Sequence, residues 1–136
     1  MIQLNVVNET SRLKAVVLGI AQSNGPTPTP AACYDPCSLM HVKSGTYPLE
    51  SQMLNELSAL EAVFKRYNVT VFRPHIIPDC NQIFARDVAF VIEDKIIKSN
   101  ILPDRQNEFS AMSHILEQID SRKIIELPQC HHRIFP

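Results

Sequence analysis

Two stretches of the chain repeat the same order of structural signals, and this repeat constrains the fold more than any other feature. "LEAVFKRYNVTVFRP" (60–74) and "LEQIDSRKIIELP" (116–128) each show an amphipathic helix, a charged turn, an apolar strand and a proline, with Leu60 aligned to Leu116. The two stretches are 56 residues apart. Repeats of this length indicate stacked supersecondary units that bury their faces against one another. We therefore predict an α/β fold with mixed sheets, made of about two units.

The first unit has a strand, a long loop, a helix and a second strand. "LKAVVLGI" (13–20) is a continuous apolar run, typical of a buried strand, and "NVTVFRP" (68–74) is a second strand that ends at proline. Residues 21–47 are rich in Pro, Gly, Ser, Thr and Asn and predict an irregular loop. A helix follows Pro48, because apolar residues recur at spacings of three and four at Leu49, Met53, Leu57, Leu60 and Phe64.

The sequence of the second unit predicts the full order of strand, strand, helix and strand. "VAFVIED" and "KIIKSN" flank a tight Glu93–Asp94 turn and indicate a β-hairpin. Asp104 can cap the next helix. That helix has an apolar face of Phe109, Met112, Leu116 and Ile119. "KIIELP" (123–128) is the final strand, and "QCHHRIFP" (129–136) fits no period.

Composition excludes several classes of protein. The chain has 136 residues, 45% hydrophobic and 20% charged, which fits one globular domain. Thirteen Lys and Arg balance fourteen Asp and Glu without a basic run, so we expect no nucleic-acid partner. The polar start of the chain predicts neither a signal peptide nor a membrane span. Four cysteines without an export signal favour thiols and a cytoplasmic location. They are Cys33, Cys37, Cys80 and Cys130.

A charged pair, Arg86–Asp87, stands at the start of the apolar run in "CNQIFARDVAFVIED" (80–94). A carboxylate at the end of a strand binds a planar guanidinium well, through two parallel charge-assisted hydrogen bonds. Spacing alone favours a plainer interpretation, in which Arg86 and Asp87 pair with other residues or Asp87 caps the loop.

The stretch "NQIFARDVAFVIEDKIIKSNILPDRQNE" resembles the N-terminal signature of the guanidino-group-modifying enzymes. This superfamily includes arginine deiminase, dimethylarginine dimethylaminohydrolase and the glycine amidinotransferases. Its signature is an aromatic residue, Arg-Asp, two strands about a turn, and then Arg and Glu opening a helix. The matching positions are Phe84, Arg86, Asp87, Arg105 and Glu108. "NETSRLKAVVLG" resembles the opening strand of the family, so the match extends over residues 5–127.

The resemblance implies a fold and a set of roles. The fold is a five-bladed α/β propeller of the pentein type, of which residues 1–128 would be the N-terminal part of a single domain and 129–136 an irregular tail. Asp87 would bind the guanidinium of arginine or a modified arginine, while Asn81 and Phe84 shape the pocket. Arg86, Arg105 and Glu108 would be structural supports. The family commonly has Gly where this chain has Glu93, and we expect a type I turn to accommodate the change.

The resemblance also implies chemistry whose parts this sequence lacks. In the family a cysteine thiolate attacks the guanidinium carbon, a histidine transfers protons, and neither metal nor organic cofactor takes part. The nucleophile lies late in the family's chain, and the histidine follows a Glu-Gly-Gly-Asp element that is absent here. We therefore expect a truncated member of an amidinotransferase or arginine deiminase type, with no assignable catalytic residue and no activity alone.

Two other hypotheses remain open. A partial propeller exposes sheet edges, so the chain could be a non-catalytic guanidinium-binding or assembly module that completes its sheets with another chain or as a homo-oligomer. A zinc site of Cys33, Cys37, Cys130, His131 and His132 has an unfavourable spacing, and we predict no metal. Cys80 is interpreted as structural, because Asp79 would raise its pKa. His41 and His75 carry no pattern, and His114 is expected to pack beside the apolar face of its helix.

Overall fold

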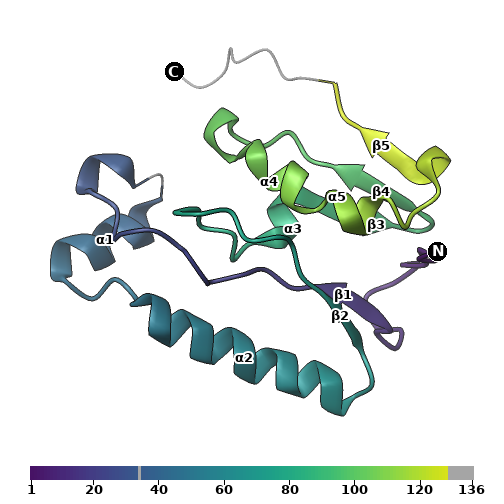
Figure 1. Ribbon diagram of the computed structural model, residues 1–136, viewed down its shortest axis with the longest axis horizontal. Coiled ribbons are helices and arrows are strands. Elements are labelled where there is room, and N and C mark those ends of the chain that lie inside the picture. Colours follow the sequence, from purple (N-terminus) through teal and green to yellow (C-terminus); the bar gives the residue numbers. More distant parts are fainter. Residues whose placement is uncertain (34, 129–136) are drawn as a thin grey trace.

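The computed structural model describes residues 1–33 and 35–128, which form a mixed α/β structure with two small sheets (Figure 1). The predicted tail 129–136 lies outside the described residues. The elements, in chain order, are β1 (Ala15–Val17), η1 (Pro30–Ala32), α1 (Pro36–Ser44), α2 (Glu50–Arg66), β2 (Thr70–Phe72), α3 (Ala85–Val88), β3 (Ala89–Ile92), β4 (Lys95–Lys98), η2 (Pro103–Arg105), α4 (Asn107–Ala111), α5 (Ser113–Leu116), η3 (Ser121–Lys123) and β5 (Ile124–Glu126).

The first unit is a parallel pair, β1 and β2, joined by α2. Ala15 pairs with Thr70 and Val17 with Phe72, so the two strands run side by side from end to end. The helix and both strands are confirmed, because each depends on a local apolar pattern. The expectation that the first strand is buried is wrong for β1 itself: its side chains are exposed or half-buried, and burial begins at Leu18. A sheet of two strands covered by one helix has too few neighbours to bury both faces.

The second unit has the predicted order of strand, strand, helix and strand. β3 and β4 form an antiparallel hairpin with Ile92 opposite Lys95, and β5 joins β4 in parallel. The short helices α4 and α5 make the crossover between β4 and β5, which a parallel pair requires. The described residues contain these two units and no closed ring of blades.

The prediction that residues 21–47 form an irregular loop is wrong, because this stretch contains the helix α1. Asp35 caps the helix through its side chain, which accepts a hydrogen bond from the Ser38 backbone N–H at 2.8 Å. Pro36 occupies the first turn, and Gly45 ends the helix with a φ of 68°. Three good capping residues outweigh the polar composition of this stretch.

The single helix predicted after Asp104 is broken into η2, α4 and α5. Asp104 lies inside η2, and the N-cap of α4 is Gln106, whose side chain makes no capping bond. The break between α4 and α5 falls at Met112, where hydrogen bonds of the tighter 3₁₀ type appear at Phe109–Met112 and Met112–Ile115. Met112 is buried at this bend, so core packing overrides the helical period.

The hairpin turn between β3 and β4 is not the expected type I turn. Glu93 has a φ of 51°, whereas the first central residue of a type I turn has a φ of about −60°. The backbone N–H and C=O of Glu93 both bond to Val6 at 2.8 Å, in an isolated antiparallel bridge. This bridge holds Glu93 in the left-handed region, where the glycine common in the family would be unstrained.

The core lies mainly in the second unit. Its buried apolar side chains are Val88, Ile96, Ala111, Met112, Ile115 and Ile119. The first unit contributes Leu18, Ala21 and Val69. No helix within the described part of the chain has both the length and the apolar character to cross a membrane.

Candidate functional site

The segment that carries the predicted site residues, 81–88, lies between the two units. It passes β1 through a backbone hydrogen bond from Ile20 N–H to the Gln82 carbonyl, at 3.0 Å. The chain then turns once as α3, in which the Asp87 N–H donates to the Phe84 carbonyl at 3.0 Å. Asp87 therefore lies on a short helix two residues before β3, and 44% of its side chain is exposed.

Arg105 joins the two acidic residues of the predicted site. Its Nη1 donates to Asp87 Oδ2 at 3.0 Å. Its Nε and Nη2 donate to the two carboxylate oxygens of Glu108, at 2.6 and 3.2 Å, in the bidentate geometry that suits a guanidinium. Glu108 is only 3% exposed, so its charge is compensated almost wholly by Arg105. The structure thus brings together three residues that are separate in sequence.

The electrostatics of this cluster keep Arg105 charged. The hydrogen bonds that Arg105 donates to Glu108 raise the pKa of the guanidinium above its ordinary value, partial burial opposes this, and the bond to Asp87 adds to it. The guanidinium is therefore a permanent cation, held by a buried carboxylate on one side and a half-exposed one on the other. Such an arrangement fixes the orientation of the Asp87 carboxylate.

The remaining predicted residues lie on the same segment without joining the cluster. Asn81 is exposed, and its side-chain oxygen accepts from the Ile83 backbone N–H at 3.1 Å. Phe84 is half exposed at the N-cap of α3. Arg86 is largely exposed, and its Nε lies 3.9 Å from Asp87 Oδ1, a distance too long for a hydrogen bond.

Two residues that position this segment carried no signal in the sequence. Gln82 is fully buried, and its amide accepts from the Ile77 N–H at 2.7 Å and donates to the His75 carbonyl at 2.9 Å. Gly19 lies directly against the same backbone, since a Cβ there would be 1.9 Å from the Ile83 carbonyl oxygen. The Gly19 contact joins segments that are distant in sequence, and the Gln82 bonds lie within the irregular loop that follows β2. Local periodicity reveals neither.

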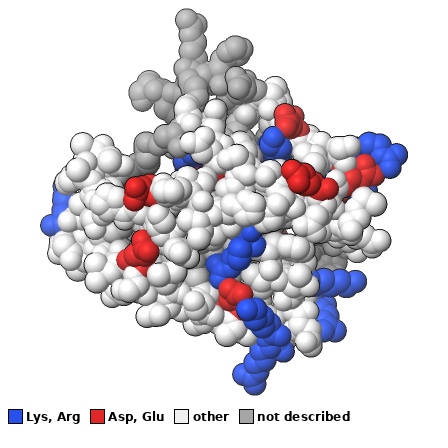
Figure 2. Space-filling view, in the orientation of Figure 1, with Lys and Arg blue, Asp and Glu red and all other residues white. Residues whose placement is uncertain are grey.

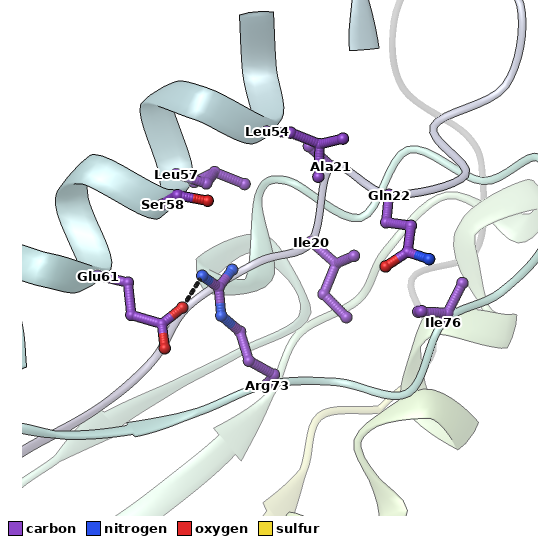
Figure 3. Close-up of a pocket in the computed structure, with 9 residues that line it drawn as sticks. All are labelled: Ile20, Ala21, Gln22, Leu54, Leu57, Ser58, Glu61, Arg73 and Ile76. Carbon is purple, nitrogen blue, oxygen red and sulfur yellow. Dashed lines mark hydrogen bonds and ion pairs between the residues drawn. The ribbon is translucent and has the colours of Figure 1, made fainter. Parts of the chain in front are cut away.

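A cavity of about 230 Å³ lies on the other side of the first unit, between α2 and the segments that follow β1 and β2 (Figure 3). Its apolar wall includes Leu54, Leu57 and Ile76. Glu61 and Arg73 form an ion pair at one end, and Arg73 also donates to the Gly19 carbonyl. A second cavity, of about 290 Å³, lies beside Lys98 and Phe109. Neither cavity is lined by Asn81, Phe84 or Asp87.

The other candidates that fall within the described residues are not assembled into a site. Within 1–33 and 35–128, no three His, Cys, Asp or Glu residues are placed to hold a metal ion. Cys33 and Cys37 are thiols, while Cys130, His131 and His132 lie outside the described residues. His114 stacks on His75, with ring centroids 3.9 Å apart and planes 4° from parallel. This packing agrees with the expectation for His114 and involves a partner that the sequence did not suggest.

Comparison with known proteins gives a fold. No family model matches the chain, and no curated protein matches it. Among solved structures, inosamine-phosphate amidinotransferase StrB1 from Streptomyces griseus matches with a TM-score of 0.69 and 23% identity. SxtG, an amidinotransferase from Microseira wollei in the saxitoxin biosynthetic pathway, matches with a TM-score of 0.65 and 19% identity. Each alignment covers 94% of this chain and 44% of the other.

The chain therefore spans less than half the length of these two proteins. Over that part, the order of elements is the one that the motif around Asp87 predicted. The expected fold is confirmed: this chain has the fold of part of the two amidinotransferases.

Proposed function

We propose that this chain is the guanidinium-binding part of an enzyme that modifies arginine or an arginine-like compound, with Asp87 as the ligand of the substrate cation. One observation carries the proposal. In a chain with an amidinotransferase fold, Asp87 is half exposed and is fixed by a guanidinium that a buried carboxylate anchors. Arg105 occupies Asp87 Oδ2, and Arg86 Nε lies 3.9 Å from Oδ1, too far for a hydrogen bond. Oδ1 is therefore the oxygen that an incoming guanidinium would engage.

The proposed reaction follows the chemistry of the superfamily. A cysteine thiolate adds to the guanidinium carbon, an amine or ammonia leaves, and the covalent amidino group passes to an amine or to water. In this scheme Asp87 binds and orients the cation, and Asn81 and Phe84 border it. Arg105 and Glu108 hold Asp87 in place, and residues 1–128 belong to a propeller domain. The printed sequence has no Glu-Gly-Gly-Asp element, so we propose that these 136 residues do not turn over by themselves.

A second candidate is a binding or assembly module that completes its sheets with another chain. The three-stranded sheet ends in β5, and Ile125 and Leu127 on and beside that strand are exposed. Exposed sheet edges favour pairing with a further strand. In either case, the balance of charges and the thiols favour a cytoplasmic protein without nucleic-acid partners.

Binding of L-arginine to the purified chain tests the proposal. We expect calorimetric or NMR titration to detect weak binding that Asp87→Asn abolishes. Asp120→Asn is the matched control, because Asp120 also holds an arginine side chain, Arg122, at 2.7 Å in another part of the structure. No binding by the unaltered chain, or equal loss in the two variants, would refute the role of Asp87.

Activity assays test the predicted lack of turnover, and an assay of complex formation separates the two candidates. We expect neither arginine deiminase nor amidinotransferase turnover from the chain alone. Turnover would contradict the proposal that these 136 residues lack the groups needed for catalysis. Arginine binding without turnover is expected of both candidates. A stable complex formed through β5, lost on Ile125→Lys, would favour the assembly module.

A further inference from the structure

Helix α2 carries an apolar stripe that the rest of the described chain leaves exposed. Its positions are spaced by four and three residues in alternation, which is the heptad pattern of helices that pack along their length. The positions are Leu49, Met53, Glu56, Leu60, Val63 and Tyr67. Five of the six are apolar or aromatic, and Glu56 interrupts the stripe near its middle.

The stripe faces away from the unit to which α2 belongs. No residue of α2 is buried, although Leu57 and Phe64, on the adjacent face, are half-buried, and so is Met53 within the stripe. By contrast, Leu49 is 62% exposed, Leu60 42%, Val63 49% and Tyr67 67%. In Figure 1, α2 lies along one boundary of the molecule, with the strands on one side and no element on the other.

We propose that this stripe is the interface of a homodimer in which α2 packs antiparallel against α2 of a second copy. A twofold axis near Ser58 brings every stripe position opposite another one. Leu49 then faces Tyr67 of the other copy, Met53 faces Val63, and Glu56 faces Leu60. In an antiparallel pair, alternate seam positions interdigitate in this way, so the stripe is complementary to itself.

The charges along α2 favour the same orientation. Glu50 and Glu56 lie in the N-terminal half of the helix, and Lys65 and Arg66 lie in its last turn. Glu61, in the C-terminal half, is neutralised by ion pairs with Lys65 and Arg73, so that half keeps a positive balance. An antiparallel partner places the acidic half of one helix beside the basic half of the other, and it also opposes the two helix dipoles. A parallel partner would align like charges. Figure 2 shows that Lys and Arg side chains gather toward the lower right of the face in view, with wide uncharged areas over much of the rest.

The available area predicts a weak dimer. The exposed fractions of the four stripe side chains leave on the order of 400 Å² of apolar surface per chain. Two chains would then bury about 800 Å² of stripe together, below the roughly 1,200–2,000 Å² of stable interfaces. Glu56 opposite an apolar side chain weakens the pair further. The dimer should therefore dissociate on dilution through the micromolar range.

Analytical ultracentrifugation over a wide concentration range tests this inference with two variants, one expected to weaken the dimer and one expected to strengthen it. Leu60→Glu should leave the chain monomeric at every concentration, because it puts two acidic side chains opposite each other. Glu56→Leu should tighten the dimer at least tenfold, because it completes the apolar stripe. Asn55→Glu, on an exposed position away from the stripe, carries the same added charge as Leu60→Glu and should dimerise like the unaltered chain.

Urea unfolding and circular dichroism of each variant establish that the fold is intact. A chain that is monomeric at all concentrations would overturn the inference. So would a dimer that Leu60→Glu and Asn55→Glu affect equally, since association would then use another surface, such as the β5 edge. The outcome does not depend on the binding of arginine, so it is independent of the proposed function.

Discussion

Replacing Glu108 by Gln should destabilise the chain more than replacing Asp87 by Asn, although both carboxylates bind the same guanidinium. Glu108 is 3% exposed and makes two charge-assisted hydrogen bonds to Arg105, at 2.6 and 3.2 Å. Hydrogen bonds to charged groups contribute about 1.5–3 kcal/mol each when buried. In Glu108→Gln one amide N–H group must face the guanidinium, donor against donor. Because the Arg105 side chain is 27% exposed and can recover some water contacts, we expect a net loss of about 2 kcal/mol.

The corresponding loss for Asp87→Asn is smaller, because its side chain is 44% exposed and makes a single bond of 3.0 Å. Exposed pairs of this kind contribute about 0–1 kcal/mol. With a urea dependence of about 2 kcal/mol per molar, Glu108→Gln should lower the unfolding midpoint by about 1 M and Asp87→Asn by less than about 0.5 M. Arginine binding should follow the reverse order and depend mainly on Asp87. Equal shifts in the two midpoints would refute the division between an anchor and a ligand.

Three further predictions concern the supports of this site. Gly19→Ala should lower the melting temperature by at least 10 °C, because the new Cβ would overlap the Ile83 carbonyl; an unchanged melting temperature would show that the backbone moves freely there. Gln82→Leu should lower the free energy of unfolding in urea by about 2 kcal/mol, because two backbone groups lose their hydrogen-bond partners. A smaller decrease than that of the control Gln118→Leu, at an exposed position, would contradict this. Hydrogen bonds from Lys65 and then from Arg73 lower the pKa of Glu61 below its ordinary 4.5, so Glu61→Gln should be less stable than the unaltered chain at pH 7. This difference in stability should disappear as the pH falls through and below 4.5. A difference that persists in acid would exclude an electrostatic cause.

The elements that the sequence predicted well are those that depend on neighbours along the chain. The period of α2 and the alternation of β3 and β4 are local patterns, and both were recognisable from residue type alone. Helix α1 was also encoded locally, by Asp35, Pro36 and Gly45, but its low apolar content hid it. The polar composition of this stretch predicts a loop, but its capping residues determine that a helix forms.

The site could be predicted only in part, for a different reason. The motif identified Asp87, Arg105 and Glu108 as a group, but their order in the sequence did not indicate that Arg105 would bridge the two carboxylates. Gly19 acts through a contact between segments whose relative position depends on the whole fold, and Gln82 acts by bonding the backbone of an irregular loop, which has no period. The Gly19 contact requires the three-dimensional packing of both units, and no spacing rule along one chain contains that information.

The first residues of the chain have a consequence for the order in which the protein can fold during synthesis. Ile2 donates its backbone N–H to the Gln118 carbonyl at 2.7 Å, and Val6 exchanges two hydrogen bonds with Glu93. Each contact closes a loop over most of the chain, and such long loops slow folding. On the ribosome, Val6 stays unpaired until Glu93 has emerged, and Ile2 stays unpaired until Gln118, which follows α5, has emerged. Until Val6 has docked, the left-handed backbone of Glu93 lacks the bridge that holds it. We therefore expect the hairpin to become fully ordered only after the N-terminal segment has docked.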